Sequence, residues 1–167
     1  MSWARVAYRS RQFFGALRAR LEEEERAEVA AHLTPPEQHL FYSMDLRDQR
    51  HALDVFRVLK SGGQRHASLL AAALLHDAGK GPIRLWQRVA FVLLRAVSPR
   101  LLLRLVSGDR PGWRGALARS LDHAERGAGL AEAAGSTAET VRLIRLHRSP
   151  PGDDVALALL QAADESS

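Results

Sequence analysis

The sequence contains no cysteine. This absence excludes disulfides, thiolate metal sites and cysteine nucleophiles, and it makes a reducing cytoplasm the expected location. β-Branched residues are also scarce, because Val, Ile and Thr together number 15, against 27 Ala and 26 Leu. Sheets are built largely from β-branched residues, so this balance argues against a β-sandwich, a barrel or a doubly wound sheet.

Long apolar runs are missing as well. The apolar stretch 89–94 is bounded by Arg88 and Arg95, so it is far too short to span a bilayer. The basic N-terminus is not followed by the uninterrupted apolar run of a signal peptide. The sequence therefore predicts neither a membrane span nor a secretory signal.

Lysine is nearly absent, because 22 of the 24 basic residues are Arg. The formal net charge is +5, which is compatible with phosphate-bearing ligands, nucleic acid or an anionic membrane surface. The charge does not choose among these partners, and an Arg-rich composition alone also accounts for it. No nucleic-acid-binding motif accompanies the charge, so nucleic acid is not the expected partner.

Apolar residues recur with helical spacing along most of the chain, and capping and turn residues separate the apolar segments. Thr34-Pro35-Pro36-Glu37 is typical of a helix start, and Ser136 with Glu139 forms a second expected capping box. Helices are expected over one or two segments in 3–31, and over 34–44, 45–61, 68–76, 82–98, 99–106, 113–134, 137–147 and 154–167. The predicted fold is a single-domain all-α bundle of about seven to nine helices.

The chain shows no internal repeat and no linker between domains. We interpret residues 1–34 as an N-terminal helical extension. Residues 35–167 then form one helical domain, which carries an accessory helical segment at 82–110. Helices that deliver side chains inward from several directions suit a metal site inside the bundle.

His76-Asp77 stands out among the seven His residues by its surroundings. The pair lies at the C-terminal end of the most apolar predicted helix and is followed at once by a Gly turn. Two such polar side chains at the end of a buried helix are costly unless something pairs with them, and a divalent cation would do so. The C-terminal end of the helix dipole also favours a cation.

Five segments of the sequence together resemble the HD-domain metal-dependent phosphohydrolases. They are, in order, Asp48-Gln49-Arg50-His51, the string LLHDAGK at 74–80, His123 with Gly127-Ala128, Ile144-Arg145-Leu146-His147, and Ala162-Ala163-Asp164. The resemblance covers about residues 35–167 and implies an HD domain that hydrolyses a phosphoester, such as a nucleotide. The glycine-tyrosine-proline signature of the cyclic-dinucleotide phosphodiesterases is absent after His147, so that activity is less expected.

The resemblance implies a metal site made of His51, His76, Asp77 and Asp164. The spacing supports it, because the 25 residues from His51 to His76 are enough for a helical hairpin that brings the two side by side. Two imidazoles and two carboxylates suit Mn²⁺, Fe²⁺, Co²⁺, Ni²⁺, Zn²⁺ or Mg²⁺, and the sequence does not select among them. Such an ion lowers the pKa of a bound water and polarises the phosphorus centre, which makes Asp77 central to catalysis.

His123 and His147 match the positions that hold a second metal in some relatives, with Asp77 as the bridging ligand. Binuclear relatives often have a His-His pair where this chain has His147-Arg148, and Arg cannot serve as a metal ligand. We therefore expect one metal in preference to two. In the one-metal case, His123 and His147 lie nearby as phosphate or water contacts.

Three cationic residues are expected near the substrate phosphate. Lys80 follows the HDAG turn, and its compact charge can swing onto a phosphoryl oxygen during catalysis. Arg50 lies beside His51, and Arg145 lies on the predicted helix of His147. These two arginines are weaker candidates for the same role.

The segment 82–106 is least like a minimal HD core. Arg84, Arg88 and Arg95 fall on one stripe of its predicted helix, with apolar residues on much of the opposite side. We favour an accessory helix that packs over the bundle and shapes the mouth of the pocket. The alternative is a basic amphipathic helix that lies on an anionic membrane or buries a partner surface.

The favoured function is a metal-dependent phosphohydrolase that acts on a small phosphorylated substrate. The alternative is a non-catalytic HD module that binds a phosphorylated ligand, or a scaffold at a membrane surface. Asp164 lies three residues from the C-terminus, where helices fray, and this position keeps the alternative open. A homo-oligomer is also compatible with the sequence.

Overall fold

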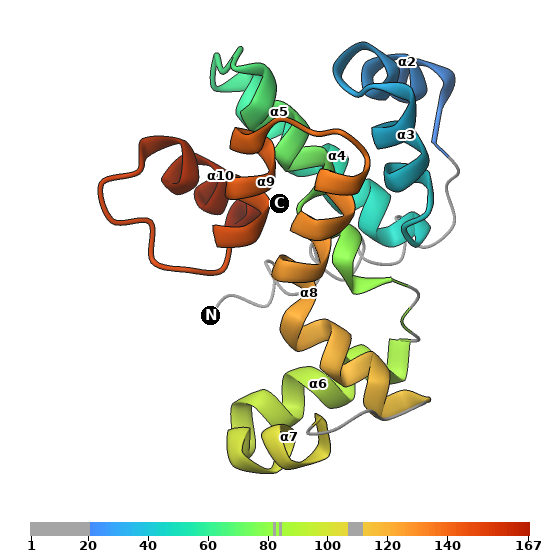
Figure 1. The fold of residues 1–167 in the computed structure, drawn as a ribbon, viewed down its shortest axis with the longest axis vertical. Coiled ribbons are helices and arrows are strands. Elements are labelled where there is room, and N and C mark those ends of the chain that lie inside the picture. The colour runs from blue at the N-terminus through green and yellow to red at the C-terminus, as the bar shows by residue number, and fades with distance from the viewer. Residues whose placement is uncertain (1–20, 82, 84, 107–111) are drawn as a thin grey trace, which may run out of the picture.

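Every regular element that the computed structural model describes is a helix. The described residues are 21–81, 83, 85–106 and 112–167, and they contain no strand. Nine α-helices lie in these ranges: α2 (Glu23–His32), α3 (Pro35–Tyr42), α4 (Leu46–Ser61), α5 (Ala67–Leu75), α6 (Leu85–Val97), α7 (Pro99–Val106), α8 (Trp113–Ala133), α9 (Ala138–Leu146) and α10 (Val155–Ser166). A short 3-10 helix, η1 (Ala78–Lys80), follows α5. The predicted all-α class is confirmed (Figure 1).

Capping residues set the starts of α3 and α9. Thr34 caps α3 in the predicted capping box, in which the Thr34 N–H and hydroxyl both donate to Glu37 Oε2 at 2.8 Å. The predicted cap of α9 was one residue too early, because Thr137 rather than Ser136 accepts the Thr140 N–H, at 3.2 Å. The Ser136 hydroxyl instead donates to Glu37 Oε1 at 2.6 Å, which ties the start of α9 to α3.

The core is centred on α5, whose residues 69–75 are all buried, as its continuous apolar composition predicts. α2, α3, α4, α9 and α10 all contact it. Val29 and Leu33 belong to the same core cluster, so residues 21–34 pack with the later helices. The rest of the predicted N-terminal extension, residues 1–20, lies outside the described residues.

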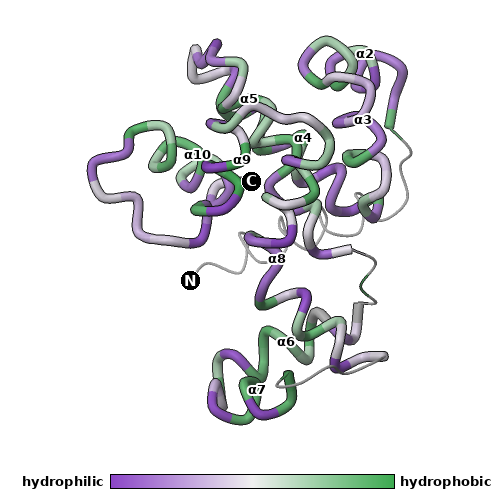
Figure 2. Tube along the Cα trace, viewed as in Figure 1, coloured by the Kyte–Doolittle hydropathy of each residue, from purple (hydrophilic) through white to green (hydrophobic). Residues whose placement is uncertain are grey.

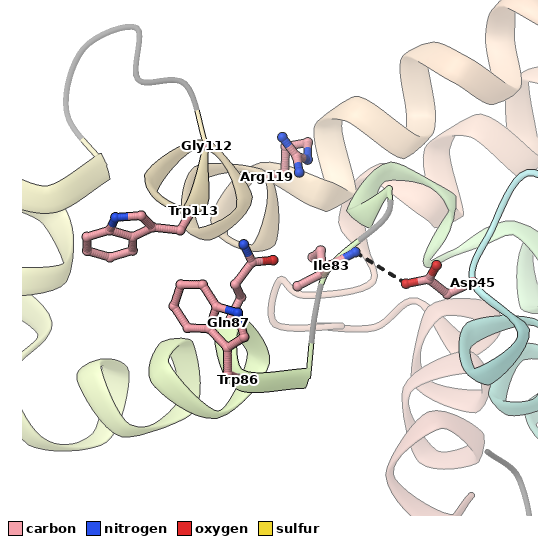
Figure 3. A pocket seen from close by; sticks show the side chains of 7 residues that line it. All are labelled: Asp45, Ile83, Trp86, Gln87, Gly112, Trp113 and Arg119. Atoms are coloured by element: carbon pink, nitrogen blue, oxygen red, sulfur yellow. Dashed lines mark hydrogen bonds between the residues drawn. The ribbon is translucent and has the colours of Figure 1, made fainter.

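α6 and α7 lie at one end of the molecule, away from α2–α5 (Figure 1). They pack on each other and on α8. The predicted helix over 82–98 begins later, at Leu85, since the Ile83 N–H donates to the Asp45 carboxylate at 3.2 Å and the chain is not helical there (Figure 3). Pro82, Arg84 and 107–111 lie outside the described residues. Within the described ranges, no helix has the length and apolarity needed to cross a membrane.

η1 packs against α8 at a distance that only glycine allows. A Cβ on Gly79 would lie 2.0 Å from the carbonyl oxygen of His123 and 2.5 Å from the backbone nitrogen of Gly127. A Cβ on Gly127 would lie 3.2 Å from the backbone nitrogen of Gly79. Gly79 has no positive φ, so close approach rather than a turn conformation explains this residue. The two glycines bring the end of α5 against the middle of α8.

Candidate metal centre

Three helices deliver the predicted metal ligands to one place. His51 lies on α4, His76 and Asp77 follow α5, and Asp164 lies on α10. Asp164 Oδ1 is 2.8 Å from His51 Nε2 and 3.6 Å from His76 Nε2. His76 Nε2 is also 3.7 Å from Asp77 Oδ2. The four residues that the resemblance implied are therefore neighbours.

His123 of α8 and His147, which directly follows α9, extend this group. Their Nε2 atoms are 3.1 Å apart, and His123 Nε2 is 3.6 Å from Asp77 Oδ1. The rings of His76 and His147 have centroids 5.3 Å apart. The side chains of His76, Asp77, His123 and His147 are all buried, so the centre lies within the bundle and not on its surface.

Backbone carbonyls fix the orientation of three of the rings. In each ring the Nδ1 donates to the carbonyl oxygen of the residue three positions earlier, at 2.9 Å for His76, 2.9 Å for His123 and 2.7 Å for His147. A carbonyl oxygen can only accept, so each Nδ1 carries the proton and each Nε2 of the neutral ring presents a lone pair. Histidines that bind metals are commonly oriented by such a bond from the second ring nitrogen.

The three lone pairs converge on Asp77. His76 Nε2 is buried and has no hydrogen-bond partner. The Nε2 atoms of His123 and His147 face each other as two acceptors, which is unfavourable unless a cation lies beside them. Together with the carboxylate of Asp77, this donor set fits a divalent cation on its own geometry, independently of any resemblance.

Burial and neighbouring charges set the protonation states of the centre. Burial, together with the charge of His76, lowers the pKa of His147 to about 4, and burial also lowers the pKa of His123. Burial opposes the charged form of His76, but the carboxylates of Asp77 and Asp164 outweigh burial and raise its pKa. Burial likewise opposes the ionised form of Asp77, yet the surrounding cationic groups hold its pKa far below the usual range. The ionised Asp77 and the neutral rings of His123 and His147 are in the states that bind a metal, whereas His76, whose pKa is raised, has to release a proton when a metal binds.

The ligand atoms form two overlapping groups. His51, His76 and Asp77 offer atoms within 4.8 Å of one another, and Asp77, His123 and His147 do the same. Asp77 belongs to both groups, in the place of the bridging ligand that the resemblance implies. The described geometry thus offers donors for two ions, whereas the sequence favoured one.

A cavity of about 610 Å³ adjoins the second group. His123 and Lys80 line it, and Lys80 also forms an ion pair with Asp77, so the cavity reaches the metal centre. The cationic lining residues are Arg47, Lys80, Arg95 and Arg148, and the apolar ones are Ile83, Phe91, Val92 and Ala96. No carboxylate occurs among the described lining residues. Such a lining suits an anion with an uncharged group attached.

A smaller cavity of about 360 Å³ lies on the side of His147 and Asp164. Glu165 also lines this cavity, so two carboxylates face it. Arg148 lines both cavities. The larger cavity is therefore the better place for a phosphate group.

Two of the three predicted phosphate contacts lie elsewhere. Arg50 forms an ion pair with Glu25, and Arg145 forms one with Glu125 at 3.1 Å, so neither lines the larger cavity. The cations that do line it beside Lys80 were missed from the sequence: Arg47, Arg95 and Arg148. Arg95 was named only as part of the basic stripe on the accessory helix, and Arg148 only as the loss of a ligand. No local signal distinguishes Arg47 among 22 arginines.

Comparisons of the chain with protein-family models, curated proteins and solved structures find no match. A functional proposal therefore depends on the donor groups and the cavity themselves.

Proposed function

We propose that this chain is a metal-dependent phosphohydrolase of the HD-domain kind that cleaves a small phosphate ester. The observation that carries the proposal is the convergence of three buried imidazole lone pairs on Asp77, directly beside a cavity lined by cations. A hydrolase for phosphate esters needs a metal-binding donor group in contact with an anion pocket. Here His123 belongs to both, and Lys80 lines the pocket and pairs with Asp77.

Two divalent ions would be held by the described donors. His51, His76, Asp77 and Asp164 would hold one, and Asp77, His123 and His147 the other. This mixed set of nitrogen and oxygen donors accepts Mn²⁺, Fe²⁺, Co²⁺, Ni²⁺, Zn²⁺ or Mg²⁺. When bound, such ions supply a water of lowered pKa and a Lewis acid for a phosphoryl oxygen.

The chain's own residues bind and orient the phosphate group. Lys80 stands between the cavity and Asp77, and Arg95 and Arg148 place further positive charge on the cavity wall. Fixed cations at this place offset the negative charge on the non-bridging oxygens as the transition state forms. The apolar wall, which includes Phe91, excludes water from the remainder of the substrate.

A non-catalytic module that binds a phosphorylated ligand is the alternative, and it uses the same cavity. Two sequence features favoured it: the position of Asp164 near the C-terminus, and Arg148 in the place of a possible ligand. In the structure α10 extends beyond Asp164 to Ser166, and the Asp164 carboxylate is 2.8 Å from His51 Nε2. The position of Asp164 therefore no longer favours the alternative.

Turnover that requires a metal distinguishes the two functions. The chelator-treated chain is supplied with Mn²⁺ and assayed on nucleoside mono-, di- and triphosphates and on generic phosphodiesters. We expect hydrolysis only with the metal, loss of hydrolysis in His76→Ala, and unchanged hydrolysis in His66→Ala, whose imidazole is exposed at the start of α5. A metal-loaded chain that binds inorganic phosphate but hydrolyses nothing in the panel would establish the binding module instead.

A further inference from the structure

Large apolar side chains are exposed on α6, α7 and the first residue of α8. Val97 is 82% exposed and Val92 is 62% exposed. We define the apolar end as the eight exposed residues of this region: Trp86, Val89, Val92, Leu93, Val97, Leu101, Leu103 and Trp113. Figure 2 shows hydrophobic segments on α6 and α7, at the end of the molecule opposite α2 and α3. Large apolar side chains exposed in such number on neighbouring helices are typical of an interaction site.

α6 and α7 each have a packed face in addition to these exposed residues. Leu102 of α7 is buried, and Phe91 and Leu94 of α6 are partly buried. Both helices pack on α8, so these inward residues already provide their attachment to the bundle. The outward apolar residues form a second apolar surface, which needs a partner of its own.

Charge separates this region from the rest of the chain. The segment 82–106 contains five Arg and no Asp or Glu, and residues 1–20 contain five Arg and no Asp or Glu. All other residues together hold 14 basic and 19 acidic side chains. The net positive charge of the protein therefore resides in these two segments, and an anionic partner complements the charge of the segment that carries the apolar end.

This charge pattern argues against two occupants that the chain itself provides. A two-fold contact between copies would bring two copies of the same positively charged surface together, which charge repulsion opposes. Residues 1–20 are equally basic, so they do not complement the segment 82–106 either. A bilayer with anionic head groups offers both an apolar interior boundary and negative charge.

Two tryptophans lie at the edge of this surface. Trp86 and Trp113 have ring centroids 6.2 Å apart, and both are exposed. Figure 3 shows them at the end of a cavity of about 530 Å³, with Asp45 at the opposite end. Tryptophan is enriched where membranes meet water, because the ring is apolar and its N–H still reaches a polar partner.

We propose that the apolar end docks α6 and α7 onto an anionic lipid bilayer, with the helices lying in the interface and not crossing it. Val92 belongs both to the apolar end and to the wall of the cavity beside the metal centre. Docking therefore brings the mouth of that cavity to the lipid surface. The proposal does not depend on catalysis, and it holds for a hydrolase or for a binding module.

Flotation of the full chain with vesicles tests the docking. The protein is expected to float with vesicles of equal parts phosphatidylcholine and phosphatidylglycerol, to float much less with phosphatidylcholine alone, and to be released as salt rises. Leu93→Asp combined with Val97→Asp should reduce flotation to background. Val155→Asp is the matched control, because Val155 is 72% exposed at the start of α10, and it should float as the wild type does.

Arg100→Glu tests the charge without touching the apolar side chains. Arg100 is exposed on α7 and does not line the cavity, and reversing one charge should weaken binding about thirtyfold. Circular dichroism and metal content report whether each variant is folded. The proposal is overturned if the wild type does not float with anionic vesicles. It is also overturned if the variant with both Leu93→Asp and Val97→Asp floats as Val155→Asp does. It is also overturned if sedimentation velocity shows a dimer that requires Val97 while no vesicle binding occurs.

Discussion

The metal centre buries polar side chains, whereas the apolar end exposes apolar ones. Beside α5 the chain buries three imidazoles and a carboxylate. At the apolar end, seven large apolar residues of α6 and α7 are exposed, together with Trp113 of α8. Buried ionisable groups and exposed apolar surface are both unfavourable in an isolated domain. We therefore propose that each region binds something outside the chain: divalent cations at the centre and an anionic bilayer at the apolar end.

The two regions also differ in how tightly the backbone holds them. The centre is fixed by the contact of Gly79 with α8 and by the Nδ1 hydrogen bonds of three rings. At the apolar end, α6 and α7 are attached to the bundle through their packing on α8. Substitutions should therefore lower the free energy of unfolding much more at the centre than at the apolar end.

Gly79→Ala should have the largest effect on stability. Its Cβ would lie 2.0 Å from a backbone oxygen of α8, so η1 or α8 has to move, at a cost of about 3 kcal/mol or more. Gly129→Ala is the control on the same helix, because its Cβ would meet nothing within 4 Å, and it should stabilise the protein by about 0.5–1 kcal/mol. Chemical denaturation measures both. Equal stability of the two variants would contradict the close contact.

The stability of the metal-free protein should fall in acid because of His147. Burial first, and then the charge of His76, lowers the pKa of His147 from 6.5 to about 4, so between these values the unfolded chain binds more protons than the folded one. This contribution is complete above pH 6.5 and is lost as the pH falls towards 4, by up to about 3 kcal/mol. The free energy of unfolding against pH checks this.

The comparison for this acid effect is between His147→Gln and His66→Gln. The first variant should remove this part of the pH dependence, since glutamine does not titrate. The second should retain it, because His66 is exposed and caps the opposite end of α5 from His76. If both variants keep the wild-type slope, His147 is not the group responsible.

Arg148→Ala should raise the KM for a phosphate ester, or the Kd for inorganic phosphate, about tenfold. Arg148 lines the cavity beside the metal centre, and losing one charged contact to a phosphate costs about 1.5 kcal/mol. Arg145→Ala should change neither constant, because Arg145 pairs with Glu125 away from the cavity. The opposite ranking of the two variants would place the phosphate beside Arg145, one of the two weaker candidates from the sequence.

Val97→Ser should have the smallest effect on stability, within about 0.5 kcal/mol, since Val97 is largely exposed. Leu74→Ala in the fully buried α5 should cost about 2–5 kcal/mol. Thermal unfolding in the absence of lipid measures both. A large loss in Val97→Ser would show that the apolar end is part of the core.

Much of the fold follows from the sequence. The continuous apolar run of α5, the Thr34–Glu37 capping box and the prolines at 35, 36 and 99 each act locally, so helices there are predictable within a residue or two. The start of α6 was predicted too early because the Ile83 N–H bonds to Asp45, a residue 38 positions away. The cap of α9 was misplaced for the same kind of reason, since Ser136 contacts Glu37 on another helix.

The candidate site, like the fold, was predictable from the sequence only in part. The six residues named from the ordered His and Asp pattern come together in the structure. The arginines of the cavity wall do not follow from that pattern, because they come from α4, α6 and the turn after α9, and only the tertiary packing of these segments brings them together. The contact of Gly79 with Gly127 was also hidden, since in sequence Gly79 is typical of an ordinary turn.

If Asp77 is shared by two groups of metal ligands, the number of ions that the protein binds depends on Asp77 and on each group separately. Chelator-treated wild type, His147→Ala and Asp77→Ala are each titrated calorimetrically with Mn²⁺, and bound metal is confirmed by elemental analysis after gel filtration. We expect two ions for the wild type, one for His147→Ala and none held tightly by Asp77→Ala, because Asp77 contributes to both groups. A wild type that binds no ion, or an Asp77→Ala variant that binds as many ions as the wild type, would contradict this expectation.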